Sequence, residues 1–151
     1  MNNDEMQLTE VVKLSQSEKR EQVFVTLFLS GFYDEQDKAE AIATYYEIQN
    51  FSKELAAQLK ERYESVTARL GEIDTLLAKY AIGWNLERIG KAEISILRLA
   101  AFEILYDESI PEKVAANEAV ELAKKYGSVD SYGFINGIIG KVIQNSRESS
   151  V

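Results

Sequence analysis

The longest apolar stretch of the chain runs from residue 93 to residue 106 and reads EISILRLAAFEILY. Its apolar positions leave no continuous polar face, whereas a helix at a protein surface carries a single apolar stripe. Ser95, Arg98 and Glu103 interrupt the run and point in different directions, so the segment is too short and too broken to cross a bilayer. We therefore predict a buried central helix over 93–106, with other helices packed around it.

Apolar residues also recur at helical spacing before this segment. Ser15 and Glu18 have the spacing of a capping box and should begin a helix that ends near Gly31. Ser52 should cap a third helix, and Gly71 should separate it from a short fourth one. The N-terminal half is therefore predicted to consist of amphipathic helices joined by short turns.

Two further helices are predicted after the central one. Ser109 opens a second capping-box pattern, with Pro111 in the first helical turn and Gly127 where the helix should end. Either Asp130 or Ser131 can cap the last helix. The predicted fold class is therefore all-α.

Glycines at positions 133, 137 and 140 line one side of the predicted last helix. Each costs about 1 kcal/mol of helix propensity relative to alanine. Close approach of a neighbouring helix is the explanation that we favour, and room for a ligand is the alternative. They do not form a phosphate loop, because no strand precedes them and no Gly-Lys-Ser/Thr sequence follows.

The residue composition excludes several classes of functional site. The chain has 151 residues, one proline, no cysteine and no histidine. This excludes disulfides, thiol nucleophiles, histidine bases and the usual zinc ligand sets, so we expect neither an enzyme nor a bound metal or cofactor. We predict one helical domain over residues 15–146, a mobile N-terminal tail over 1–14 and a C-terminal tail over 147–151.

The formal net charge of −8 argues against a protein that binds nucleic acid on its own through overall electrostatic attraction. No signal peptide, transit peptide or lipidation motif is recognisable at the start of the sequence, which indicates a cytoplasmic protein.

The C-terminal half contains IPEKVAANEAVELAKKYG followed by SYGFINGIIGKV, and WNLERIGKAEISILRLAAFEILY precedes them. With EKREQVFVTLF near the N-terminus, these segments closely resemble the NusB transcription antitermination family. The resemblance covers roughly Glu18 to Val142 and weakens between Tyr33 and Lys79. Its most specific motifs are Ile110-Pro111, Asn117-Glu118-Ala119 and Phe134-Ile135-Asn136-Gly137.

The resemblance implies a fold of seven helices in two bundles, arranged around the buried helix 93–106. It also implies an adaptor that pairs with the ribosomal protein NusE and binds boxA-type single-stranded RNA. In the family, this pair helps to hold RNA polymerase in a processive antitermination complex on rRNA operons.

The family's functional positions carry over to few residues. Its arginine-rich RNA-binding motif corresponds here to SQSEKR, where Lys19 and Arg20 are basic and Lys13 lies nearby. Phe134 matches an RNA-contacting aromatic of the family, and Asp130 a position beside it.

Two positions match the surface of the family that faces NusE. They are Phe28, an aromatic position, and Glu93, an acidic one. An acidic side chain opposite a basic partner would add orientation and encounter rate more than affinity.

Two classes of function therefore remain open. The first is an RNA-binding antitermination factor that binds RNA weakly alone and tightly with NusE. The second is a protein–protein scaffold, or a self-associating homodimer, with little RNA binding of its own. The small number of basic residues favours the second class, whereas Phe134 and the C-terminal motifs favour the first.

Overall fold

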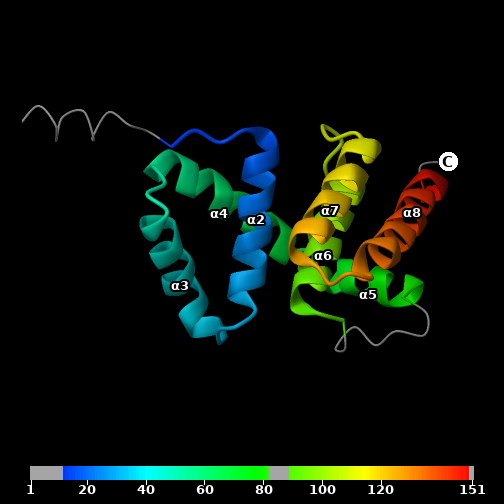
Figure 1. Ribbon diagram of the computed structural model, residues 1–151, viewed down its shortest axis with the longest axis horizontal. Coiled ribbons are helices and arrows are strands. Elements are labelled where there is room, and N and C mark those ends of the chain that lie inside the picture. The colour runs from blue at the N-terminus through cyan, green and yellow to red at the C-terminus, as the bar shows by residue number, and fades with distance from the viewer. Residues whose placement is uncertain (1–11, 82–88, 150–151) are drawn as a thin grey trace, which may run out of the picture. The chain divides into compact units, whose positions relative to one another are not determined.

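The computed structural model describes residues 12–81 and 89–149, and its regular structure in these ranges is entirely helical (Figure 1). The helices are α2 (Gln16–Ser30), α3 (Glu35–Ile48), α4 (Lys53–Thr67), α5 (Leu70–Tyr80), α6 (Lys91–Tyr106), α7 (Glu112–Tyr126) and α8 (Ser131–Ser149). The all-α prediction is confirmed. None of the helices described is long and apolar enough to cross a membrane.

The chain divides into two compact units, Met1–Tyr63 and Glu64–Val151, with the boundary inside α4. The predicted mobile tail over 1–14 lies mostly outside the described residues. At the other end, α8 continues to Ser149, so residues 147–149 are helical rather than part of the predicted C-terminal tail.

The first helix of the first unit begins at the predicted capping box. Ser15 Oγ accepts a hydrogen bond from the Glu18 amide at 3.1 Å, and Glu18 Oε1 accepts one from the Ser15 amide at 2.9 Å. The bond from the Ser15 backbone lowers the pKa of the Glu18 carboxyl. Gly31 lies at the other end of α2, as predicted. The reciprocal bonds satisfy two backbone donors that the start of a helix otherwise leaves free.

Polar side chains join α2 to α3 inside the first unit. Thr26 Oγ1 donates to the Gln22 carbonyl at 2.8 Å and lies 2.8 Å from the Tyr46 hydroxyl, which therefore donates to it. Tyr45 donates to the Gln22 side chain at 2.6 Å. Burial raises the pKa of Tyr46 to about 12. Because buried hydroxyls are costly without a partner, these bonds restrict how the two helices can slide.

The second unit is built around α6, which packs against α5, α7 and α8. Ile96 and Leu97, at its centre, are fully buried. Arg98 leaves the same helix toward α5, where its Nε and Nη2 donate to the two carboxylate oxygens of Asp74 at 2.9 and 2.8 Å. The predicted buried central helix is confirmed, and it begins two residues earlier, at Lys91.

Three local predictions are wrong or only partly right. The break between α4 and α5 lies at residues 68–69, and Gly71 is in the first turn of α5. Pro111 occupies the N-cap of α7, and Ser109 does not cap that helix. Both the amide and the hydroxyl of Ser109 instead bind Asp107 Oδ1. The Asp107 carboxylate is only two residues from Ser109 and forms a local turn with it. This local hydrogen bonding competes with capping of α7 by the Ser109 hydroxyl.

The glycines of α8 do not have the role that we favoured. A Cβ built on Gly133, Gly137 or Gly140 would meet nothing within 4 Å, and all three positions are exposed. The helix uses its other side for packing, through the buried residues Ile135, Ile138, Ile139 and Val142. Close approach of another described helix of the second unit is therefore excluded as the reason for these glycines.

Replacing Gly140 with alanine should stabilise the protein. The new Cβ meets open space, and alanine in a helix interior is favoured over glycine by about 1 kcal/mol. The expected result is a free energy of unfolding higher by about that amount in urea denaturation followed by circular dichroism.

Gly127→Ala is the matched opposite case. Its Cβ would lie 2.7 Å from the Ala123 carbonyl oxygen and would collide with Ser131 Oγ. It should lower stability, and a gain from it, or a loss from Gly140→Ala, would contradict this description of α7 and α8.

Candidate nucleic-acid interface

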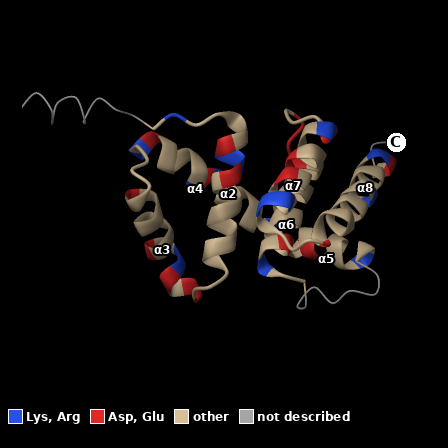
Figure 2. Ribbon diagram, in the orientation of Figure 1, with Lys and Arg blue, Asp and Glu red and all other residues tan. Residues whose placement is uncertain are grey.

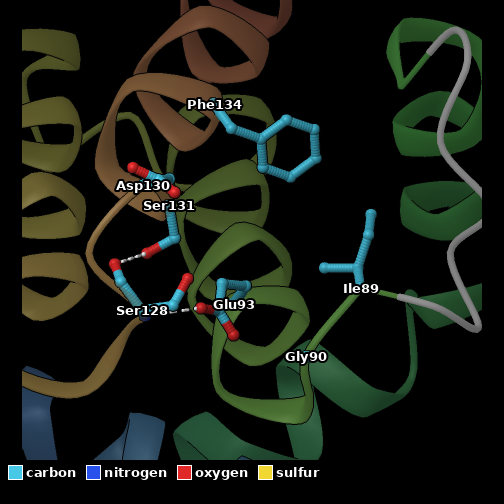
Figure 3. A pocket seen from close by; sticks show the side chains of 7 residues that line it. All are labelled: Ile89, Gly90, Glu93, Ser128, Asp130, Ser131 and Phe134. Atoms are coloured by element: carbon cyan, nitrogen blue, oxygen red, sulfur yellow. Dashed lines mark hydrogen bonds between the residues drawn. The ribbon is translucent and has the colours of Figure 1, made fainter.

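The start of α6, the start of α8 and the α7–α8 loop enclose a hollow of about 180 Å³ (Figure 3). It is lined by Ile89, Gly90, Glu93, Ser128, Asp130, Ser131 and Phe134. We call it the Phe134 pocket. It lies wholly within the second unit and brings together three residues that the sequence analysis selected, namely Glu93, Asp130 and Phe134.

Glu93 holds the loop that forms one wall of this pocket. Its Oε2 accepts a hydrogen bond from the Ser128 amide at 2.9 Å (Figure 3). Ser131, in turn, donates from its hydroxyl to the Ser128 carbonyl at 2.9 Å. Ser128, in the loop between α7 and α8, thus has both its backbone amide and its backbone carbonyl hydrogen-bonded.

Two glycines make room for the Glu93 carboxylate. A Cβ on Gly90 would collide with Glu93 Oε1, and a Cβ on Gly127 would lie 3.3 Å from Glu93 Oε2. The carboxylate therefore fits between the residue that caps α6 and the residue that ends α7. A charged acceptor with a backbone donor forms one of the stronger classes of hydrogen bond in proteins.

Phe134 and Asp130 present different chemistry at the pocket. The Phe134 ring is half-buried, and Figure 3 shows it across the pocket from the Ile89 side chain. Asp130 is exposed and directly precedes α8. The exposed part of an aromatic ring can stack on a nucleobase, and a carboxylate can accept hydrogen bonds from base amino groups or ribose hydroxyls.

The other candidate residues for RNA lie on α2, in the first unit. Lys19 and Arg20 are half-buried in its first turns, and Lys13 is exposed in the segment that precedes it. The Lys19 amide donates to the Ser15 carbonyl at 2.9 Å, which places its Cα within the capped first turn.

Phe28 belongs to a row of aromatic rings near the end of α2. Its ring stacks on Phe24 with centroids 6.1 Å apart and meets Phe32 edge-on at 5.1 Å. Phe24 is buried, whereas Phe32 and the adjacent Tyr33 are 57% and 45% exposed. Phe28 is thus the middle ring of a row that begins in the core and ends at the surface, an arrangement suited to a protein contact.

Sequence reasoning missed Ser128, which interacts through its backbone groups and therefore has no side-chain signal. It identified Gly127 as the end of a helix and missed that this glycine leaves space for the Glu93 carboxylate. It also missed Phe32, an aromatic residue four positions after Phe28 and two positions past the end of α2. Among the residues that the structure describes, no group of three or more acidic, histidine or cysteine side chains could hold a metal ion.

Comparison with known proteins identifies relatives over nearly the whole chain. The model of the NusB family matches residues 17–144. The transcription antitermination protein NusB of Lachnoclostridium phytofermentans is 43% identical over 131 residues, which are 86% of this chain and 99% of that protein. The NusB protein of Agathobacter rectalis is 37% identical over 129 residues, covering 85% and 98% of the two chains.

Solved structures share the fold. T. maritima NusB superposes with a TM-score of 0.73 at 30% identity, covering 88% of this chain and 93% of that one. The antitermination factor NusB in a complex with NusE and double-stranded RNA gives a TM-score of 0.69 at 20% identity. That match covers 87% of this chain and 99% of the other, and at this identity it shows the fold alone.

Removing the Glu93 carboxylate should loosen the α7–α8 loop. Glu93→Ala leaves the Ser128 amide without its acceptor, and a hydrogen bond of this kind contributes about 1 kcal/mol net. Exchange of the Ser128 amide, followed by NMR, should therefore accelerate roughly fivefold. Glu93→Gln keeps an acceptor oxygen and should change exchange less.

The control is Glu121→Ala, which removes the same charge from an exposed position on α7. It should leave Ser128 unchanged. Equal exchange in wild type and Glu93→Ala would show that the bond does not hold the loop.

Proposed function

We propose, from the premise that this chain belongs to the NusB family, that it is a transcription antitermination factor that binds boxA-type single-stranded RNA together with NusE. Membership also confirms that the chain is not an enzyme, because NusB proteins are non-catalytic factors of transcription. In the proposal it acts in the cytoplasm as part of an RNA polymerase antitermination complex. The observation that carries the RNA-binding part is the Phe134 pocket.

The pocket supports RNA binding through its combination of groups. The half-buried Phe134 ring can stack on a base through its exposed part, and the exposed Asp130 carboxylate can accept hydrogen bonds from the RNA. Ser128 is bound through both backbone groups, so part of the loop before Asp130 is held before RNA arrives. A preformed site loses less entropy on binding than a mobile one.

Charge explains why a partner is needed. The chain carries a net charge of −8, and its basic candidates at the start of α2 are Lys19, Arg20 and Lys13. Each phosphate neutralised in single-stranded RNA contributes about −0.7 to the slope of log affinity against log salt. With so few cations, the isolated chain should bind RNA weakly, and its affinity should depend only slightly on salt concentration. A basic partner such as NusE would supply the missing phosphate contacts.

The row of rings at the end of α2, formed by Phe24, Phe28 and Phe32, supports the partner contact. Phe32 is exposed and continues the aromatic surface of Phe28, and acidic residues Asp34, Glu35 and Asp37 follow it at the start of α3. Aromatic anchors beside acidic residues suit a basic protein partner, because the rings supply contact area and the charges steer encounter. Glu93 lies in the second unit, where its Oε2 accepts from the Ser128 amide, so a contact of its carboxylate with NusE would be made from the start of α6.

Phe134→Ala should weaken binding of boxA-type RNA by the complex with NusE. Loss of one base–aromatic stack costs about 1–3 kcal/mol, equivalent to roughly 5- to 150-fold in affinity. The salt slope should stay nearly constant, because the ring carries no charge. Lys19→Ala combined with Arg20→Ala should instead flatten the slope. Both effects are measured by fluorescence anisotropy at several salt concentrations.

Lys53→Ala combined with Lys60→Ala is the matched control, since both lysines are exposed in the same unit and carry the same total charge. Tight RNA binding by the isolated chain would contradict the requirement for a partner. If substitutions of Phe134, Lys19 and Arg20 all leave the RNA affinity and salt slope of the complex unchanged, the result would favour the alternative of a scaffold or self-associating homodimer.

Phe28→Asp should weaken NusE binding by tenfold or more, since an aspartate in the middle of the aromatic row buries a charge without a partner. Isothermal titration calorimetry measures the affinity, and circular dichroism verifies the fold. Ile48→Asp introduces the same charge at a residue of α3 that is 74% exposed, and it should change little. An unchanged affinity for folded Phe28→Asp would remove Phe28 from the partner surface.

A further inference from the structure

A second hollow, of about 380 Å³, lies where the end of α5 meets the C-terminal half of α8. It is lined by Lys79, Tyr80, Lys141, Gln144, Asn145 and Glu148. We call it the lysine hollow. It belongs to the same unit as the Phe134 pocket, and no candidate residue of the sequence analysis lies in it.

One face of α8 connects the two hollows. Phe134, Gly137 and Lys141 are separated by three and four positions, so they follow one another along the same side of the helix. Phe134 lines the first hollow and Lys141 the second. At a rise of 1.5 Å per residue, their Cα atoms are about 10.5 Å apart along the helix axis. A few nucleotides of an extended strand span such a distance.

Gly137 keeps the surface between the hollows low. A Cβ there would meet nothing within 4 Å, and the same is true of Gly133 and Gly140 beside it. Packing among the described residues of the second unit therefore does not explain three residues that lower helix propensity. A strand lying along α8 does explain Gly137, because its backbone can approach the helix closely only where no side chain intervenes.

The groups in the lysine hollow are those that bind a phosphodiester chain. Lys79 and Lys141 are exposed residues, and the side chains of Gln144 and Asn145 carry amide donors. Lys79 lies in the last turn of α5, where the helix dipole favours a cation, and its Nζ is 5.6 Å from the centroid of the Tyr80 ring.

One acidic residue opposes this chemistry. Glu148 also lines the hollow, and its Oε1 accepts a hydrogen bond from Gln144 Nε2 at 3.4 Å. Its charge thus faces the Gln144 amide, and the two lysines outnumber it. Figure 2 shows basic positions on both α5 and α8. Because the hollow is polar and basic, it fits a nucleic-acid backbone better than an apolar protein segment.

We propose that the lysine hollow is a second RNA subsite, in which Lys79 and Lys141 bind backbone phosphates of single-stranded RNA whose base is held at Phe134. The strand runs along α8 over Gly137. This inference rests on the proposed function, since it extends the same RNA beyond the Phe134 pocket. It also supplies cations that the short basic segment of α2 lacks.

The decisive experiment compares Lys79→Ala/Lys141→Ala with Lys113→Ala/Lys124→Ala in the complex with NusE. Both double variants remove two exposed positive charges from the same unit. The probe is a fluorescein-labelled boxA-type RNA. Loss of two phosphate contacts should reduce the magnitude of the salt slope by about 1.4, and the control should leave it unchanged. Equal slopes for the two variants would overturn the proposal.

Shortening the RNA locates the contact. With the probe trimmed from each end in turn, the effect of Lys79→Ala/Lys141→Ala should disappear for one series, because those nucleotides no longer reach the hollow. If the effect persists however the RNA is trimmed, the lysines act through long-range attraction and the subsite is refuted.

Gly137→Leu tests the path between the hollows. Leucine has a higher helix propensity than glycine, and its Cβ would meet nothing within 4 Å at this exposed position, so the melting temperature should not fall. RNA affinity should fall at least threefold, and unchanged affinity would refute the path over α8. Phe134→Ala separates the two claims: if it weakens RNA binding while the lysine and glycine variants do not, the proposed function stands and the second subsite fails.

Discussion

Burial of α6 on nearly all sides is the constraint on which the second unit depends. Its apolar residues can leave water only if α5, α7 and α8 surround it together, because no single helix covers more than part of its circumference. The one long cation of its central part, Arg98, reaches the edge of this packing and is held there by both oxygens of Asp74. A bidentate pair of this kind also sets the orientation of α5 against α6.

The same packing creates the Phe134 pocket. Helices α6, α7 and α8 contact one another, so the start of α6 comes beside the loop that leaves α7. Glu93 then accepts from the Ser128 amide, and glycines at positions 90 and 127 leave the space that its carboxylate occupies. A residue that resemblance to the family assigns to the partner surface thus also supports the loop beside Asp130. The proposed partner binding and the proposed RNA binding would be connected physically through this carboxylate if NusE contacts it.

The acidic composition is compatible with the proposed RNA binding because charge is distributed unevenly along the chain. Lys19 and Arg20 lie at the start of α2, and Lys79 and Lys141 line a hollow between α5 and α8. Affinity for RNA depends on the cations within a Debye length of the strand, about 8 Å at physiological salt, more than on the sum over the chain. The net charge of −8 still opposes approach and favours a basic partner.

The sequence alone determined the fold class, the central helix, the capping box at Ser15 and the family, since these depend on local periodicity and short motifs. Tertiary structure decided the rest. Ser109 has the spacing of a cap, but Asp107 competes for it at closer range. The glycines of α8 suggested helix packing, yet a Cβ at each of them would meet open space. A glycine pattern in the sequence shows where side chains are absent, but it does not show which part of the molecule faces those positions. Ser128 contributes through its backbone amide, and Lys79 lies 62 positions before Lys141, so only folding reveals either site.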